Sequence, residues 1–225
     1  MSAPQPDPAA LAPPQQRHEP RWPASLAILA ALVLYVTLPD KFVLGPRYLI
    51  PGLEGALVAA LTVTAPHRRW DESAGRRIAA VVLIVIVNVA NVTSLGFLVH
   101  ELLSGGKATG NELIFSAVQI WLTNIIVFSL WFWETDRGGP GCRARRDETP
   151  PDFLFPQSIT PEIAPRDWSP SYLDYLYVAF TNATAFSPTD TMPLTATAKV
   201  LMLVESLASF VTVAVVAARA VNILS

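Results

Sequence analysis

The sequence predicts an all-α membrane protein, a polytopic bundle of transmembrane helices. Of its 225 residues, 52% are hydrophobic and only 15% are charged, whereas a soluble domain carries about 25% charged residues. Only two of the 34 charged side chains fall in five apolar windows that together hold 97 residues: 24–39, 48–66, 78–99, 113–133 and 200–218. Helices of soluble proteins keep a polar face toward water, so windows this long and this apolar indicate helices that cross a bilayer.

The windows and the segments between them define the expected elements. Five spans are expected, over 24–38, 48–65, 78–99, 113–133 and 195–222. The chain then divides into a Pro-rich tail (1–23), four transmembrane helices (24–133), a loop rich in Arg and Pro (134–170) and a C-terminal part (171–225). The tail contains seven prolines, so we expect it to be disordered or to form polyproline II. Arginines precede the first span as in a signal peptide, but no small-residue cleavage site follows, so we expect the span to be retained.

Residues 171–186 predict a helix that enters the bilayer without crossing it. The segment is apolar at helical spacing on one face. It offers only about 15 helical residues before Ser187-Pro188, and a crossing helix needs about 20. We therefore expect five spans plus a re-entrant half-helix. The alternative is six spans, in which 171–186 crosses the bilayer and the C-terminus returns to the cytoplasm.

The distribution of basic residues predicts the orientation in the membrane. The tail, the 67–77 loop and the 134–170 loop carry two, four and five Lys or Arg, whereas the 40–47 and 104–112 loops carry two and one. Short loops enriched in Lys and Arg stay in the cytoplasm. The N-terminus and the long loop are therefore expected on the cytoplasmic side.

Two stretches carry a resemblance to a known group of proteins. They are Trp131-Phe-Trp-Glu-Thr-Asp-Arg-Gly-Gly-Pro140 and Asp174-Tyr-Leu-Tyr-Val-Ala-Phe-Thr-Asn-Ala-Thr-Ala-Phe-Ser-Pro-Thr-Asp-Thr-Met192, and a long apolar helix follows the second. Over 130–225 the chain resembles a family of uncharacterised bacterial multi-pass membrane proteins. The resemblance implies a multi-pass protein of the bacterial inner membrane and assigns no biochemical activity.

The C-terminal part is also similar in layout to the pore module of potassium-type channels, where a short pore helix and a filter precede the last transmembrane helix. Residues 181–190 stand at the filter position. A carbonyl-lined filter needs backbone conformations that glycine adopts at low cost, but no glycine follows Gly141. The charge bias also places the preceding loop in the cytoplasm, whereas that pore loop enters from outside. A carbonyl filter is therefore not expected.

A pore or cavity lined by side chains remains open at the same place. Its candidate lining residues are polar and follow one another at the end of the half-helix: Thr181, Asn182, Thr184, Ser187 and Asp190. The competing interpretation is that 187–190, with its Ser-Pro pair, is only a helix stop followed by a turn.

Two carboxylates lie inside the expected spans, Glu54 in the second and Glu205 in the last. A charge at the centre of a bilayer costs about 2.5–3.5 kcal/mol on insertion scales, so each carboxylate must be protonated, paired or in contact with a wet cavity. Glu54 is close to the start of its span and can reach the interface. Glu205 lies near mid-depth and is the main candidate for carrying a proton or cation. The structural alternative is a protonated Glu205 that hydrogen-bonds a neighbouring helix.

Other polar residues inside the spans lie on two helix faces. Asn88 and Asn91 share one face of the third span, because residues three apart are neighbours on a helix. One face of the fourth span carries Ser116, Gln119 and Thr123. These residues either line a polar core or serve only as hydrogen bonds between helices, which are worth about 0.6 kcal/mol each.

No enzyme motif accompanies this pattern, and we expect neither catalysis nor a bound cofactor or metal. His100-Glu101 begins like a zinc-protease helix, but Ser104 stands where the second histidine is needed. The sequence has no G-x-S-x-G, P-loop or dinucleotide-binding motif. A net charge of −2 gives no basic field for nucleic acid. We expect the acids and arginines of 134–148 to form solvated ion pairs.

Together these patterns predict an integral membrane protein that is pore-like or transporter-like for ions or protons. Ala214 and Ala218 form a small-xxx-small pair on the last span, which favours close helix contact and a homo-oligomer in the lipid bilayer. The alternative function is a non-catalytic scaffold that binds a partner through 134–170. In that loop the apolar run 153–155 either dips into the membrane interface or packs on the bundle.

Overall fold

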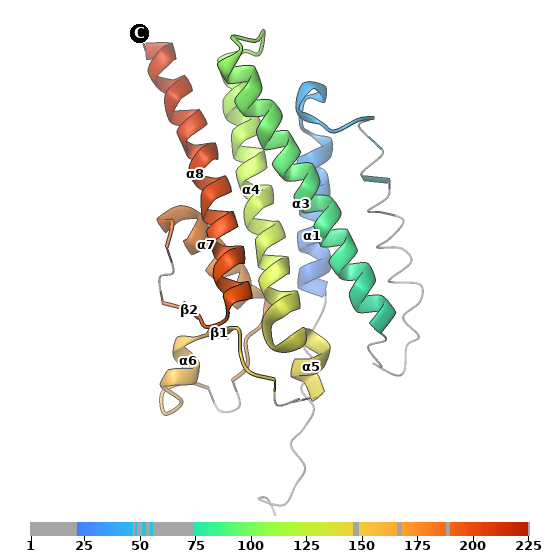
Figure 1. Ribbon diagram of the computed structural model, residues 1–225, viewed down its shortest axis with the longest axis vertical. Helices are drawn as coiled ribbons and strands as arrows, with labels where there is room; N and C mark the ends of the chain where they lie inside the picture. The colour runs from blue at the N-terminus through green and yellow to red at the C-terminus, as the bar shows by residue number, and fades with distance from the viewer. Residues whose placement is uncertain are drawn as a thin grey trace, which may run out of the picture.

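The structure is a computed structural model that describes residues 22–46, 48, 51, 52, 55, 74–145, 149–165, 168–187 and 190–224. The regular elements of this part of the chain are helices apart from one short antiparallel strand pair, which confirms the all-α prediction (Figure 1). In chain order the elements are α1 (Trp22–Val36), η2 (Asp40–Phe42), α3 (Ala74–Leu103), α4 (Gly110–Thr135), η3 (Asp136–Gly138), α5 (Pro140–Arg145), β1 (Phe153–Leu154), α6 (Pro156–Ile159), α7 (Tyr172–Ala185), β2 (Met192–Pro193) and α8 (Ala196–Leu224).

Three helices of the described part are long and apolar enough to cross a membrane. They cover Arg77–Leu103, Gly110–Gly138 and Ala196–Arg219, and the apolar helix α1 is shorter. These three agree with three of the expected spans and indicate a membrane protein. Most of the expected span 48–65, Glu54 included, lies outside the described residues, so the number of spans stays a prediction.

Helix α4 is the centre of the bundle, because it packs against α1, α3, α7 and α8. It starts at a capping box, in which the Thr109 hydroxyl accepts the backbone N–H of Glu112 at 3.3 Å. The Glu112 carboxylate in turn accepts the backbone N–H of Thr109 at 2.8 Å. This arrangement satisfies two backbone donors that the first turn leaves free. The turn before it contains Gly105 at φ +66°, a conformation that glycine reaches without strain.

Two apolar clusters hold the helices together, one toward each end of the bundle. The first joins the C-terminal half of α4 to α1, α7 and β1 through buried side chains such as Ala24, Phe128, Phe153 and Tyr175. The second joins the opposite end through Leu38, Phe42, Leu98 and Leu113, among others. Because early α1 residues meet late α4 residues, α1 runs antiparallel to α4, as α3 does (Figure 1).

The acids of the 134–170 segment were predicted to form solvated ion pairs in a loop. For Glu134 and Asp136 this prediction is wrong. Both side chains are buried, Asp136 completely. Asp136 ends α4 and accepts hydrogen bonds from the hydroxyl of Tyr175 at 2.6 Å and the backbone N–H of Asp152 at 2.8 Å. The surrounding chain folds back under the bundle and supplies donors that shield the carboxylate from water. We call residues 136–145, 152–155 and 192–195 the cap.

The apolar run 153–155 packs on the bundle, which decides between the two predicted positions. Phe153 and Phe155 are buried. Their rings lie 6.4 and 5.5 Å from the ring of Tyr175 on α7. Phe153 also lies 5.0 Å from the ring of Phe132 on α4. The cap is therefore joined to the helices by both apolar contacts and hydrogen bonds.

Helices α7 and α8 start at the same end of the bundle and run side by side in the same direction (Figure 1). The start of α7 is held to the cap by Tyr175, and the start of α8 follows β2, which pairs with β1 through Phe153 and Pro193. Helix α7 has 14 residues and α8 has 29. The chain therefore returns to the cap between the two helices, instead of continuing from α7 to the far end of the bundle.

Candidate functional site

Glu205 lies fully buried where α8 meets α4 and α7. It is the tenth residue of α8, about 14 Å along the helix axis from Ala196 at 1.5 Å per residue. That distance is close to half the roughly 30 Å thickness of a bilayer's hydrocarbon core. No Lys, Arg or His among the described residues forms an ion pair with Glu205. The depth of Glu205 in a bilayer stays a prediction.

Asn182, in the last turn of α7, is the direct partner of Glu205. Its side-chain nitrogen donates to Oε2 of Glu205 at 2.7 Å and to the backbone carbonyl of Met202 at 2.9 Å. Its side-chain oxygen accepts the hydroxyl of Ser206 at 3.1 Å. All polar atoms of the Asn182 side chain are thus used to attach the end of α7 to α8.

Asn124 on α4 completes the polar cluster, and sequence reasoning missed it. Its side-chain nitrogen donates to the backbone carbonyl of Glu205 at 3.2 Å and to the hydroxyl of Ser209 at 3.0 Å. The predicted face of this helix was Ser116, Gln119 and Thr123. Asn124 lies about 100° around the helix from its neighbour Thr123, so a search for one polar face excludes it. The sequence did contain a signal for it, because Asn124 is the only asparagine in the apolar window 113–133.

The residues of the predicted α4 face do not contact Glu205. Gln119 donates to the hydroxyl of Thr37 at 2.8 Å, beside the end of α1, and Thr123 donates to the carbonyl of Gln119 in its own helix. Ser116 is buried, and its hydroxyl has no hydrogen-bond partner among the described residues. The alternative in which these residues line one polar core with Glu205 is therefore not seen for Gln119 and Thr123, and Gln119 instead makes a hydrogen bond between helices.

The two asparagines of α3 are also separate from the cluster. Asn91 is buried and Asn88 is half-buried. In the part of the chain that the structure describes, no hydrogen bond joins either of them to Glu205. Helix α3 packs mainly on α4 and contacts α8 less, so its polar face is not brought to the site.

The remaining candidates of the half-helix lie away from Glu205. Thr184 and Ser187 are exposed and Thr181 is half-buried, and the two threonine hydroxyls bond to carbonyls of α7 itself. Asp190 is exposed. Within one copy of the chain these four side chains do not share a cavity with Asn182. Helix α7 ends at Ala185, as both interpretations of this segment require.

The C-terminal end of α7 adds an electrostatic feature to the site. Phe186 closes the helix in the left-handed conformation at φ 54°, and its N–H bonds to the carbonyl of Asn182. The last carbonyls of a helix lack intrahelical partners and give this end a partial negative charge. Asn182 lies within that last turn, so the negative helix end stands next to the carboxyl of Glu205. The combination favours a positive species at this position.

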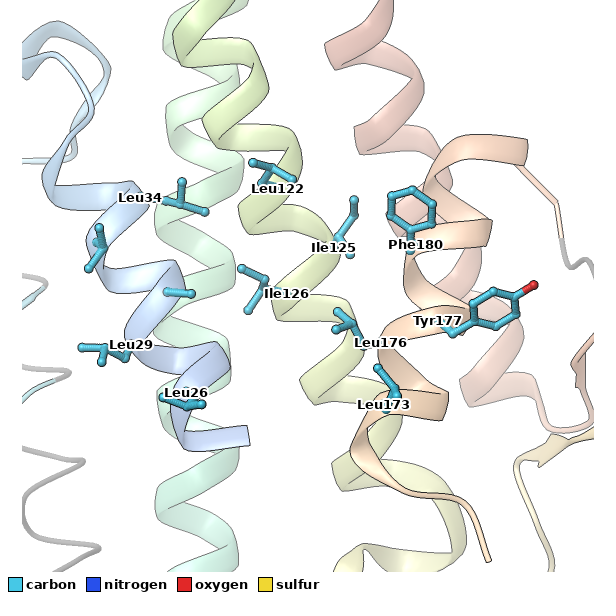
Figure 2. A pocket seen from close by; sticks show the side chains of 12 residues that line it. Leu26, Leu29, Leu34, Leu122, Ile125, Ile126, Leu173, Leu176, Tyr177 and Phe180 are labelled. Atoms are coloured by element: carbon cyan, nitrogen blue, oxygen red, sulfur yellow. The ribbon is translucent and has the colours of Figure 1, made fainter. Parts of the chain in front are cut away.

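An apolar groove of about 770 Å³ lies between α1, α4 and α7 (Figure 2). It is lined by Leu26, Leu29, Ala30, Val33, Leu34, Leu122, Ile125, Ile126, Leu173, Leu176, Tyr177 and Phe180. Tyr177 is the one lining residue with a polar group, and Figure 2 shows its hydroxyl pointing away from α4. A groove of this composition offers no ligands to an ion.

Two buried tyrosines set the position of α7 relative to α4. The hydroxyl of Tyr172 lies 2.6 Å from that of Ser129, and the hydroxyl of Tyr175 donates to Asp136. Seven residues, about two helical turns, separate Tyr175 from Asn182. The contacts at the cap therefore determine how far α7 extends along α8, and hence that Asn182 meets Glu205.

The described residues contain no group of three or more His, Cys, Asp or Glu side chains arranged to hold a metal ion. Comparison with models of protein families, with curated proteins and with solved structures finds no match to this chain. The function is therefore argued from the site itself.

Proposed function

We propose that this chain is a pore-like or transporter-like protein that moves protons or small cations across a membrane, with Glu205 as the residue that carries them. The observation that supports the proposal is the contact between Glu205 and Asn182 at the end of the half-helix α7. Interrupted helices that end inside the bilayer place their negative ends against coupling ions in transporters. A carboxyl at mid-depth is costly, and residues of this kind mark ion pathways.

The placement of α7 supports a re-entrant helix in this mechanism. Both α7 and α8 leave from the cap, and α7 ends beside Glu205 (Figure 1). With α1, α3, α4, α8 and a span at 48–65, this gives five crossings plus the half-helix. We propose the bacterial inner membrane as the location, with the cap and the N-terminus in the cytoplasm, because the cap side carries most of the basic residues.

The scaffold alternative has less free surface than the sequence suggested. Much of 134–155 is occupied by packing against the bundle, since Asp136, Phe153 and Phe155 are buried. Ile159 and Ile163 remain exposed on the outer part of the segment. The buried part of the segment is not available to a partner, so transport is the function that the geometry favours.

The test is ion flux into liposomes that contain the purified protein. A pH-sensitive dye inside reports protons, and ion-selective electrodes report Na⁺ and K⁺ under an imposed gradient. Glu205→Gln keeps the size and hydrogen-bonding shape of the side chain but removes its ability to ionise, so we expect flux to fall at least tenfold. Glu162→Gln, at an exposed position outside the spans, is the matched control and should conduct as the wild type does.

Two results would count against the proposal. A wild type that conducts while Glu205→Gln conducts equally well removes Glu205 from the pathway. A wild type that passes no proton, Na⁺ or K⁺ under any imposed gradient contradicts the transport function itself.

A further inference from the structure

The amide donors around Glu205 are few, and all of them are committed. The side-chain nitrogen of Asn182 uses its two hydrogens on Glu205 Oε2 and the Met202 carbonyl. The side-chain nitrogen of Asn124 uses its two hydrogens on the Glu205 carbonyl and Ser209. An amide NH₂ group has no further hydrogen to give. Neither asparagine can therefore supply a second donor to the carboxyl.

Two buried oxygen atoms are left without a donor in the described part of the site. They are Oε1 of Glu205 and the side-chain oxygen Oδ1 of Asn124. A buried acceptor without a donor costs about 1–3 kcal/mol, and more when it carries charge. No positive charge from these neighbours offsets this cost, because the residues that contact Glu205 from α4 and α7 are Asn124 and Asn182, which are both neutral. On α8 itself Lys199 is exposed and lies six residues before Glu205.

A metal cation does not fit these two oxygens. Hard cations such as Ca²⁺ and Mg²⁺ take six or more oxygen ligands. The side-chain oxygen of Asn182 already accepts Ser206, and the backbone carbonyls nearby are used by the helices or by the asparagines. A proton needs only one oxygen, and it converts that oxygen from an acceptor without a donor into a donor itself.

We propose that the ligand of this site is a single proton, held on Oε1 of Glu205, and not a metal cation. The inference rests on the proposed transport function and names the species that is moved. When the proton leaves, an ionised carboxylate remains with one amide donor beside the negative end of α7. That state is costly unless water enters the site or α7 moves away from α8.

The direct test is infrared spectroscopy of the full-length protein in lipid at neutral pH. We expect a carbonyl stretch of a protonated carboxyl group that shifts in D₂O and is lost in Glu205→Gln. The control Glu162→Gln should retain it, because an exposed carboxylate is ionised at this pH. Absence of the band from the wild type would show an ionised Glu205 and overturn the proposal.

A second measurement needs only the wild type, so it does not depend on how a variant folds. A cation that binds only the folded protein stabilises it, and the stabilisation grows with the logarithm of its concentration above the dissociation constant. We therefore compare the thermal unfolding midpoint in choline, Na⁺ and K⁺ salts at one ionic strength, and we expect the same value in all three. A higher midpoint in Na⁺ or K⁺ would contradict a proton-only site.

The liposome assay separates failure of this inference from failure of the transport function. Flux of protons without Na⁺ or K⁺ supports both. Flux of Na⁺ or K⁺ that depends on Glu205 keeps the transport function and overturns the proton as its species. Retention of the infrared band without any flux keeps the proton on Glu205 and overturns transport.

Discussion

Tyr175 and Asp136 form the residue contact that fixes α7 to the cap. Both side chains are completely buried, and Arg143 adds to the contact by placing its guanidinium 5.1 Å from the centre of the Tyr175 ring. The Arg143 side chain also donates to the carbonyls of Trp133 and Asp136, each at 2.8 Å. The end of α4, the start of α7 and α5 are therefore joined at one point. The buried hydroxyl of Tyr175 contributes one of the hydrogen bonds at this point.

Tyr175→Phe removes that hydroxyl and leaves Asp136 with one donor fewer. We expect a loss of about 1–3 kcal/mol in the free energy of unfolding, measured by denaturation in detergent micelles. Tyr177→Phe on the same helix is the control, because the Tyr177 side chain is about half exposed. Equal stability of the two variants would show that the Asp136 contact does not hold the helix.

At the scale of elements, the start of α8 is held by the cap as well. The Thr195 hydroxyl donates to the Asp152 carboxylate at 2.5 Å and accepts the backbone N–H of Ala198 at 3.2 Å. It thus caps α8 and joins the helix to the chain next to β1. The backbone N–H of Leu194 adds a bond to the Asp152 carbonyl at 2.8 Å. These contacts bring the start of α8 back to the end at which α7 begins.

Thr195→Val keeps the shape of the side chain but removes both hydrogen bonds. We expect it to lower the free energy of unfolding by roughly 1–2 kcal/mol, the usual cost of losing an N-terminal cap. Thr197→Val in the same turn, where the side chain is exposed, should change stability far less. The same denaturation measurement compares the two, and a larger loss in Thr197→Val contradicts the role of Thr195.

At the scale of the whole molecule, the parallel arrangement of α7 and α8 determines where the C-terminus lies. The far end of α8 lies at the same end of the bundle as the turn between α3 and α4, and the cap lies at the other (Figure 1). If α3, α4 and α8 cross the bilayer, the C-terminus and the 104–107 turn therefore share one side. The cap occupies the opposite side.

Reporters that are active only in the cytoplasm test this arrangement when they are inserted at the 104–107 turn, at 161–163 or at the C-terminus. We expect activity only at 161–163, because the cap side is basic and the other two positions face outside. A C-terminal reporter that is active together with the one at 161–163 would show that α7 crosses the bilayer. The alternative with six spans would then be correct, and the half-helix would be lost from the proposed mechanism.

The sequence alone determined the helical class and three of the membrane-length helices, and it put Glu205 near the middle of the last of them. These properties depend on local composition: an uncharged apolar stretch of about 20 residues crosses a bilayer as a helix whatever its neighbours are. The short length of 171–186 predicted a half-helix for the same reason. Its partner Asn182 was also among the predicted residues.

Only the tertiary structure decided which helix faces meet. It brought Asn124 to Glu205 instead of Gln119, and it buried Asp136 under a segment expected to be solvated. Neither result follows from local spacing, because a helix has several faces and the choice among them depends on the packing of residues far apart in the chain. Asp136 is buried because its hydrogen-bond donors come from Tyr175 and the backbone of 152–153, which folding alone places beside it.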